Sequence, residues 1–66
     1  MKVLKSKRLE NGRITLKRYL EKGKFRFTIQ ETDFDLGLNE ELDYTAESVF
    51  EIFDEMTLEY DFSEIA

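Results

Sequence analysis

The side chains that most often carry out catalysis are scarce in this sequence. Its serines are Ser6, Ser48 and Ser63, and the chain has no histidine or cysteine that would activate a hydroxyl or serve as a nucleophile itself. Carboxylates are plentiful, but a carboxyl group works as a catalytic acid only in a cleft that raises its pKa, and 66 residues leave little room for one. The sequence therefore predicts a protein that is not an enzyme, with no catalytic residue and no cofactor.

Residues 33–43 place carboxylates at alternate positions, as calcium-binding loops do. An EF-hand loop requires glycine at its sixth position and glutamate at its twelfth. Counted from Asp33, these positions hold Leu38 and Tyr44, so the pattern fails. The three glycines are too far apart for a phosphate-binding loop. We expect no metal site.

Charge divides the chain into two parts. Residues 1–30 hold all ten lysines and arginines with two acids, a net charge of +8, whereas residues 31–66 hold thirteen acids and no base. Such asymmetry favours a protein that binds a charged partner, and it defines two candidate surfaces.

The first surface is basic and lies on one face of expected strands. We assign to it Lys17, Tyr19, Lys24 and Arg26, with some of Lys5, Lys7 and Arg8. Cations around an aromatic ring suit single-stranded nucleic acid, whose phosphates they neutralise and whose bases stack. A pI of about 4.6 weighs against this function, because nucleic-acid-binding domains are usually basic. A solubilising lysine surface is the simpler interpretation.

The second surface is an acidic row at helical spacing. Its members are Glu47, Glu51, Asp54, Glu55 and Glu59. Glutamates four apart repel one another by about 0.2–0.5 kcal/mol per pair, and no lysine is interspersed. A solvated acidic face would explain the row, but its cost favours a surface that meets a basic protein, which charge complementarity would attract and select. We therefore expect a non-enzymatic interaction or regulatory module, in one form an inhibitor.

Self-association is a third interpretation. The basic sheet of one copy would meet the acidic helix of the next, or two uncovered sheet edges would pair. Either contact would make the protein a structural or assembly subunit and would stabilise a small domain.

Alternation of apolar and polar residues indicates the elements that position these charges. Asn11-Gly12 predicts a hairpin with a type I′ turn. Period-two patterns on both sides of a second turn at residues 21–24 predict strands. The result is a three-stranded antiparallel meander. Residues 31–44 suit either a loop or a short fourth strand that includes Phe34, Leu36 and Leu38.

Thr45 is a helix N-cap, and an apolar stripe from Ala46 to Tyr60 predicts an amphipathic helix of about fourteen residues. Phe62 and Ile65 would add to the core. We expect the helix to pack on the sheet face formed by Ile14, Leu16, Leu20, Phe25, Phe27 and Ile29. The chain is then a single α+β domain over residues 1–66, with positive and negative charges on separate faces.

The basic N-terminus is followed by no apolar run, and no stretch approaches the ~20 apolar residues that span a bilayer. We expect a cytoplasmic protein without membrane contact. No motif identifies a family. In size, and in its richness in lysine and glutamate without cysteine, histidine, proline or tryptophan, the chain is similar to small accessory proteins of bacterial viruses and mobile elements.

Overall fold

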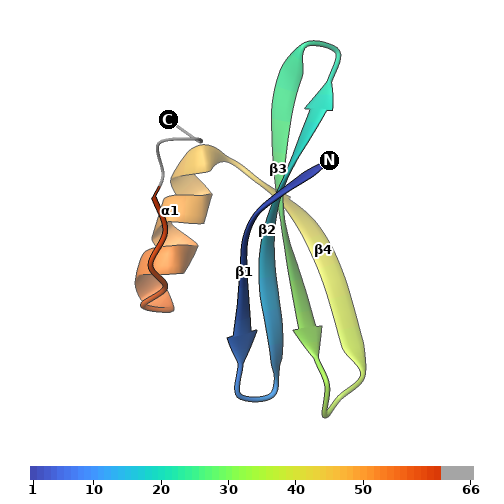
Figure 1. The fold of residues 1–66 in the computed structure, drawn as a ribbon, viewed down its shortest axis with the longest axis vertical. Helices are drawn as coiled ribbons and strands as arrows, with labels where there is room; N and C mark the ends of the chain where they lie inside the picture. Colours follow the sequence, from blue (N-terminus) through green and yellow to red (C-terminus); the bar gives the residue numbers. More distant parts are fainter. Residues whose placement is uncertain (62–66) are drawn as a thin grey trace.

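The computed structural model describes residues 1–61, and it consists of four strands followed by one helix (Figure 1). The elements are β1 (Lys2–Leu9), β2 (Gly12–Glu21), β3 (Lys24–Asp33), β4 (Leu38–Tyr44) and α1 (Ala46–Glu55). All neighbouring strands are antiparallel, in the order β1-β2-β3-β4. The α+β meander with a C-terminal helix is therefore confirmed, and the fourth strand forms. Phe34 and Leu36, however, lie in the turn before it.

The first hairpin turn differs from the expected assignment, whereas the second lies at residues 21–24 as expected. Leu9 pairs with Gly12, so the first turn consists of Glu10 and Asn11, and neither has a positive φ. The predicted type I′ turn at Asn11-Gly12 is therefore wrong. Glycine is required at position 12 for another reason: a Cβ there would lie 1.8 Å from the Thr32 carbonyl oxygen on β3. The type I′ geometry occurs in the second hairpin.

In that second hairpin Lys22 and Gly23 have φ of 51° and 74°. They connect the paired residues Glu21 and Lys24. Both central residues thus have the positive φ that a type I′ turn needs.

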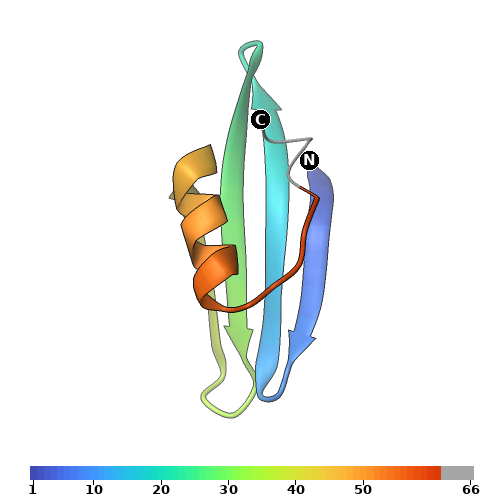
Figure 2. The same ribbon diagram turned by 90° about the vertical axis from the view of Figure 1, so that its left-hand side faces the viewer.

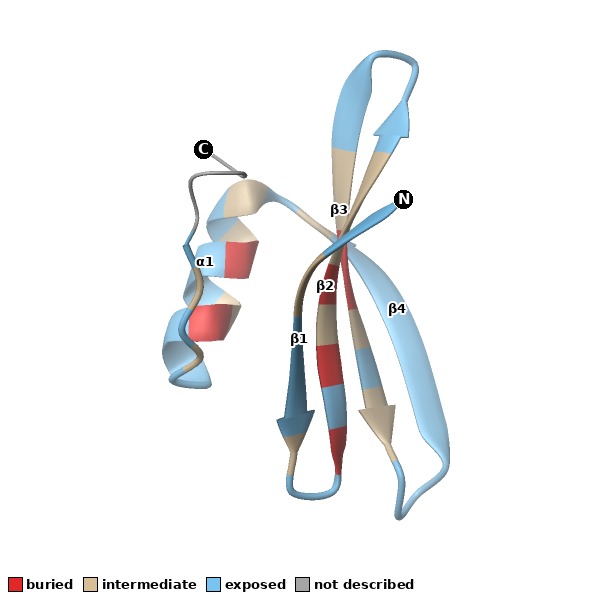
Figure 3. Cartoon of the chain, viewed as in Figure 1, coloured by how far each residue is buried: buried red, intermediate tan, exposed pale blue. Residues whose placement is uncertain are grey.

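One face of the sheet is covered by α1 and by the chain that follows it, as Figure 2 shows. The fully buried apolar side chains are Ile14, Leu16, Ile29, Val49 and Phe53. Partly buried residues surround them: Leu4, Leu9, Phe27, Tyr44, Ile52, Leu58 and Tyr60. We call this side the covered face and the other side the open face. Figure 3 places the buried residues between the sheet and α1.

The helix is shorter than predicted. Thr45 caps it as expected, accepting a hydrogen bond from the Ser48 amide. It ends at Glu55 because Thr57 adopts a φ of 52°, which allows the Leu58 amide to bond the Phe53 carbonyl at 2.8 Å. This is a Schellman motif with threonine where glycine is usual.

Glu59 and Tyr60 consequently lie beyond the helix, which corrects their assignment to it. Residues 56–61 run back over β2 and β1 (Figure 2). Tyr60 still joins the core through an edge contact with Phe53, with 5.9 Å between ring centroids. Phe62 and Ile65 lie outside the described residues.

The tip of the β2–β3 hairpin projects beyond the rest of the sheet (Figure 1). The pairing of β1 stops at Arg18 and that of β4 at Phe27, so residues 19–26 form a two-stranded arm. Leu20 and Phe25 on this arm are 67% and 55% exposed, which corrects their assignment to the core. The alternation correctly predicted that both side chains lie on the covered-face side of the sheet. The helix does not extend far enough to cover them.

Candidate functional site

The open face carries most of the predicted basic surface. Lys17, Tyr19 and Arg26 lie there, as does Lys24 on the arm, because they alternate with the buried residues of β2 and β3. Of the three β1 cations predicted for this surface, Arg8 lies on the open face, since it pairs with Arg13. The other two do not.

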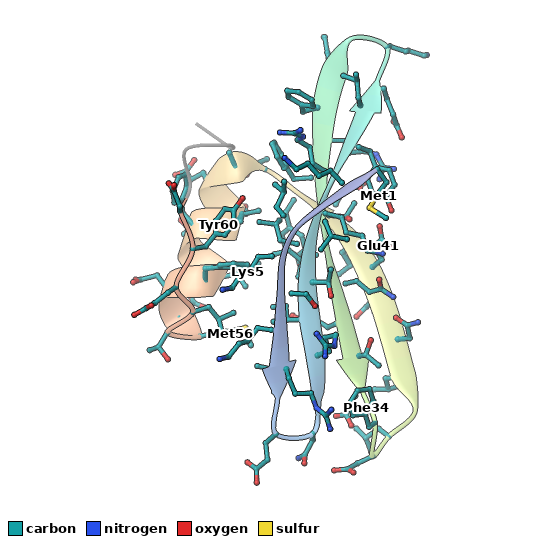
Figure 4. The ribbon with its side chains drawn as sticks, viewed as in Figure 1. Met1, Lys5, Phe34, Glu41, Met56 and Tyr60 are labelled. Carbon is teal, nitrogen blue, oxygen red and sulfur yellow. The ribbon has the colours of Figure 1, made fainter. Side chains whose placement is uncertain are left out.

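Lys5 and Lys7 lie on the covered face. They are opposite Leu16 and Ile14 in the sheet, and a bulge between Val3 and Lys5 brings β1 into this register. Figure 4 places Lys5 on the side of the sheet that faces α1. These two lysines cannot contribute to a ligand site on the open face.

Glu41 on β4 binds three side chains of the open face. Its carboxylate accepts hydrogen bonds from the Tyr19 hydroxyl at 2.7 Å and the Thr28 hydroxyl at 2.8 Å. It also forms an ion pair with Lys17 at 3.2 Å. The hydrogen bonds from Tyr19 and Thr28, and then the bond from Lys17, lower the pKa of Glu41 from 4.5 to about 2. Figure 4 shows Glu41 on the side away from the helix.

Arg26 is held in a similar way. Its guanidinium bonds Asp43 on β4 and Glu21 on β2 and lies 4.5 Å from the centre of the Tyr19 ring. The bonds to Asp43 and Glu21 raise the pKa of Arg26, and the bond to Glu41 raises that of Tyr19. Each of these groups therefore already has a partner within the chain.

Three of the four residues proposed for nucleic-acid contact are thus bound to the protein's own carboxylates. A phosphate would have to displace Glu41 and Asp43 to reach Lys17 and Arg26. Sequence reasoning missed both acids as members of this surface. The available signal was the alternation of Asn39, Glu41 and Asp43, which a strand places on one face.

The predicted acidic row is different, because its helical members have no partner of opposite charge among the described residues. Glu47, Glu51, Asp54 and Glu55 are all exposed, and within residues 1–61 none of them forms an ion pair with a lysine or arginine. Glu59 lies beside Lys5 and Lys7 over β1 instead of continuing the row.

The row destabilises the helix in two ways. Glu47, Glu51 and Glu55 are spaced four apart, which costs about 0.2–0.5 kcal/mol for each of the two neighbouring pairs. Asp54 and Glu55 also lie in the last turn, which contains no basic residue. Negative charge at that end opposes the helix dipole, an effect of about 0.3–1 kcal/mol per charge.

A cleft opens on the covered face at the end of the sheet opposite the arm. It has a volume of about 290 Å³ and is walled by Leu9, Leu38 and Met56. Glu31, Asp33 and Glu40 add three carboxylates, and Arg13 is the cation among its lining residues. We call it the acidic cleft.

Among residues 1–61 there is no cluster of three or more acidic, histidine or cysteine side chains arranged to hold a metal ion. In the same range no helix has the length and apolar character required to cross a membrane.

Comparisons with protein-family models, with curated proteins and with solved structures each found no match to this chain.

Proposed function

We propose that the protein is a non-enzymatic interaction module whose acidic helix face binds a basic surface on another protein. The face consists of Glu47, Glu51, Asp54 and Glu55. An inhibitor that occupies a basic site would use such a face, and the chain's similarity in size and composition to small accessory proteins of bacterial viruses and mobile elements agrees with this role.

The observation that supports the proposal is the contrast between two groups of acids. Glu21, Glu41 and Asp43 on the sheet are paired with the chain's own cations. The helix acids are exposed and, within residues 1–61, form no ion pair; Glu47 suits the first turn, but Asp54 and Glu55 oppose the helix dipole at its end, and Glu47, Glu51 and Glu55 repel one another. Residues that lower stability and are nevertheless present indicate a role outside folding.

Nucleic-acid binding through the open face is the weaker candidate. Lys17, Tyr19 and Arg26 are engaged by Glu41, Asp43 and Glu21, and those contacts would have to be broken first.

The proposal predicts that charge reversal on the helix abolishes partner binding without lowering the stability of the fold. In Glu51→Lys/Glu55→Lys the repulsion between positions 47 and 51 becomes attraction, and the last turn gains a favourable positive charge. The repulsion between positions 51 and 55 persists. We expect the variant to be more stable by about 1 kcal/mol, measured by urea unfolding, and to lose its partner.

The partner is sought by capture from a lysate of the source organism on the immobilised protein. The matched control is Glu10→Lys/Asp35→Lys, which changes the net charge by the same amount. Its two positions lie in the β1–β2 and β3–β4 turns, at the end of the sheet opposite the arm. We expect the unmodified protein and the control to retain the same basic protein at low salt and to release it at high salt. Equal retention by Glu51→Lys/Glu55→Lys would refute the proposal.

A further inference from the structure

The arm exposes two large apolar side chains within a basic surface. Leu20 and Phe25 are direct partners in the hairpin and point to the covered-face side. Arg18 lies over the Phe25 ring at 4.3 Å, and Lys22 and Lys24 occupy the tip. An isolated two-stranded hairpin gains little stability from its own contacts. A partner that buried these two exposed side chains would therefore stabilise the arm.

The acidic cleft has the complementary properties. Leu38 is 58% exposed and Met56 is 36% exposed, so the cleft offers apolar walls. Its two glutamates, Glu31 and Glu40, are direct cross-strand partners, an arrangement of like charges that destabilises a sheet. A cation placed between them would relieve that repulsion.

A chain cannot place its own arm in its own cleft. The arm lies at the Glu21–Lys24 end of the β2–β3 ladder, and the cleft lies at the Gly12–Asp33 end. Ten-residue strands separate the two ends by about 30 Å. Any contact between these surfaces is therefore made between molecules.

We propose that the arm of one copy docks in the acidic cleft of a second copy. Leu20 and Phe25 would pack against Leu38 and Met56, while Arg18, on the same side of the arm, and Lys22 at its tip approach Glu31 and Glu40. The contact is heterologous, because each copy offers two different surfaces, and its repetition closes a ring or extends a filament. It uses none of the helix acids, so it is independent of the proposed partner-binding face.

Like charges disfavour a symmetrical contact between the arms of two copies. Two arms packed through Leu20 and Phe25 would bring together Arg18, Lys22 and Lys24 from both copies. Like-charge juxtaposition disfavours that arrangement, whereas arm and cleft have opposite charges.

The test is analytical ultracentrifugation of charge-reversed variants at high protein concentration and low salt. The arm variant is Arg18→Glu/Lys22→Glu, and the cleft variant is Glu31→Lys/Glu40→Lys. We expect the unmodified protein to sediment faster as its concentration rises, and each variant alone to remain monomeric. An equimolar mixture of the two variants should associate again, because each altered surface then meets one of opposite charge.

Every other outcome contradicts the proposal. If only the arm variant is monomeric, the arms pair with each other. If both variants still associate, another surface, such as a sheet edge, makes the contact. If the unmodified protein is monomeric and retards a single-stranded oligonucleotide in a gel, the basic arm binds nucleic acid instead. Thermal unfolding by circular dichroism establishes that both variants are folded.

Discussion

The two faces of the sheet are built from the same strands and are stabilised by different forces. The covered face buries Ile14, Leu16 and Ile29 beneath Val49 and Phe53. Within residues 1–61 no second layer covers the open face (Figure 1), which is held by hydrogen bonds and ion pairs among polar side chains. Burial of a large apolar side chain contributes several kcal/mol, whereas an exposed ion pair contributes at most about 1 kcal/mol. The covered face therefore determines whether the chain folds.

The open face determines instead which charges are available to a binding partner. Two of its cations, Lys17 and Arg26, are paired with Glu41 and Asp43 of β4 and with Glu21 of β2, so this part of the open face is a mixed surface. The helix acids on the outside of the covered side have no such partners. The molecule is thus less polarised than its sequence suggests, and within residues 1–61 the acids without an ion pair include those of α1 and those of the acidic cleft.

The largest expected effect on stability comes from removing a buried side chain from the covered face. Phe53→Ala should lower the free energy of unfolding by about 3–5 kcal/mol, because the ring is fully buried and its loss leaves a cavity. That loss is comparable with the whole stability of a small domain. Urea unfolding followed by circular dichroism measures it.

The control is Phe34→Ala, in the exposed turn before β4, which should change stability far less. Where Phe53→Ala does not fold, Ile14→Val gives the same comparison, with an expected loss of about 0.5–1.5 kcal/mol. Similar losses for the buried and exposed phenylalanines would contradict the assignment of the core.

An intermediate effect is expected where the chain turns back over the sheet. Thr57 has a φ of 52°, a conformation that costs a β-branched residue about 1–2 kcal/mol. Thr57→Gly should therefore raise stability by about 1 kcal/mol and increase the melting temperature. Thr57→Ala keeps a Cβ and should recover less. A glycine variant no more stable than the alanine variant would mean that this turn is unstrained.

The smallest effect is expected on the open face and depends on pH. The pKa of Glu41 is about 2 in the folded protein and 4.5 in its ordinary state. As the pH falls below about 4.5, the unfolded chain takes up the proton first, so the stability contributed by Glu41 is lost between about pH 4.5 and about 2. Glu41→Gln lacks this contribution, and its stability should fall less steeply over that window.

Glu40→Gln is the matched control, since Glu40 is the neighbouring residue on β4 and points to the opposite face. The stability of this variant should still show the loss between about pH 4.5 and about 2 that Glu41 causes. Urea midpoints measured across the acidic range provide the comparison. Parallel curves for the Glu41 variant and the unmodified protein would show that the hydrogen bonds to Glu41 do not contribute.

Much of the fold could be predicted because its signals are local. Alternation identified the strands and the face of most residues on β2 and β3, whereas a bulge in β1 placed Lys5 and Lys7 on the covered face, and Thr45 marked the start of the helix. The end of the helix could not be predicted. The apolar pattern continues to Tyr60, but Thr57 takes a conformation that its side chain disfavours, and the chain reverses because Leu58 and Tyr60 then pack on the sheet.

The candidate sites were predicted less completely. The acids of α1 were found because their spacing is a property of one helix. The partners of Lys17 and Arg26 were not, because Lys17 and Glu41 are 24 residues apart and meet only through the register of β2, β3 and β4.

The sequence by itself determined the alternating strands, the amphipathic helix and the division of charge between the two parts of the chain, since each depends on residue type and short-range spacing. The tertiary structure alone decided which charges neutralise one another, which apolar residues stay exposed on the arm, and where a cleft opens. These depend on the pairing of distant strands and on how far one short helix reaches across the sheet.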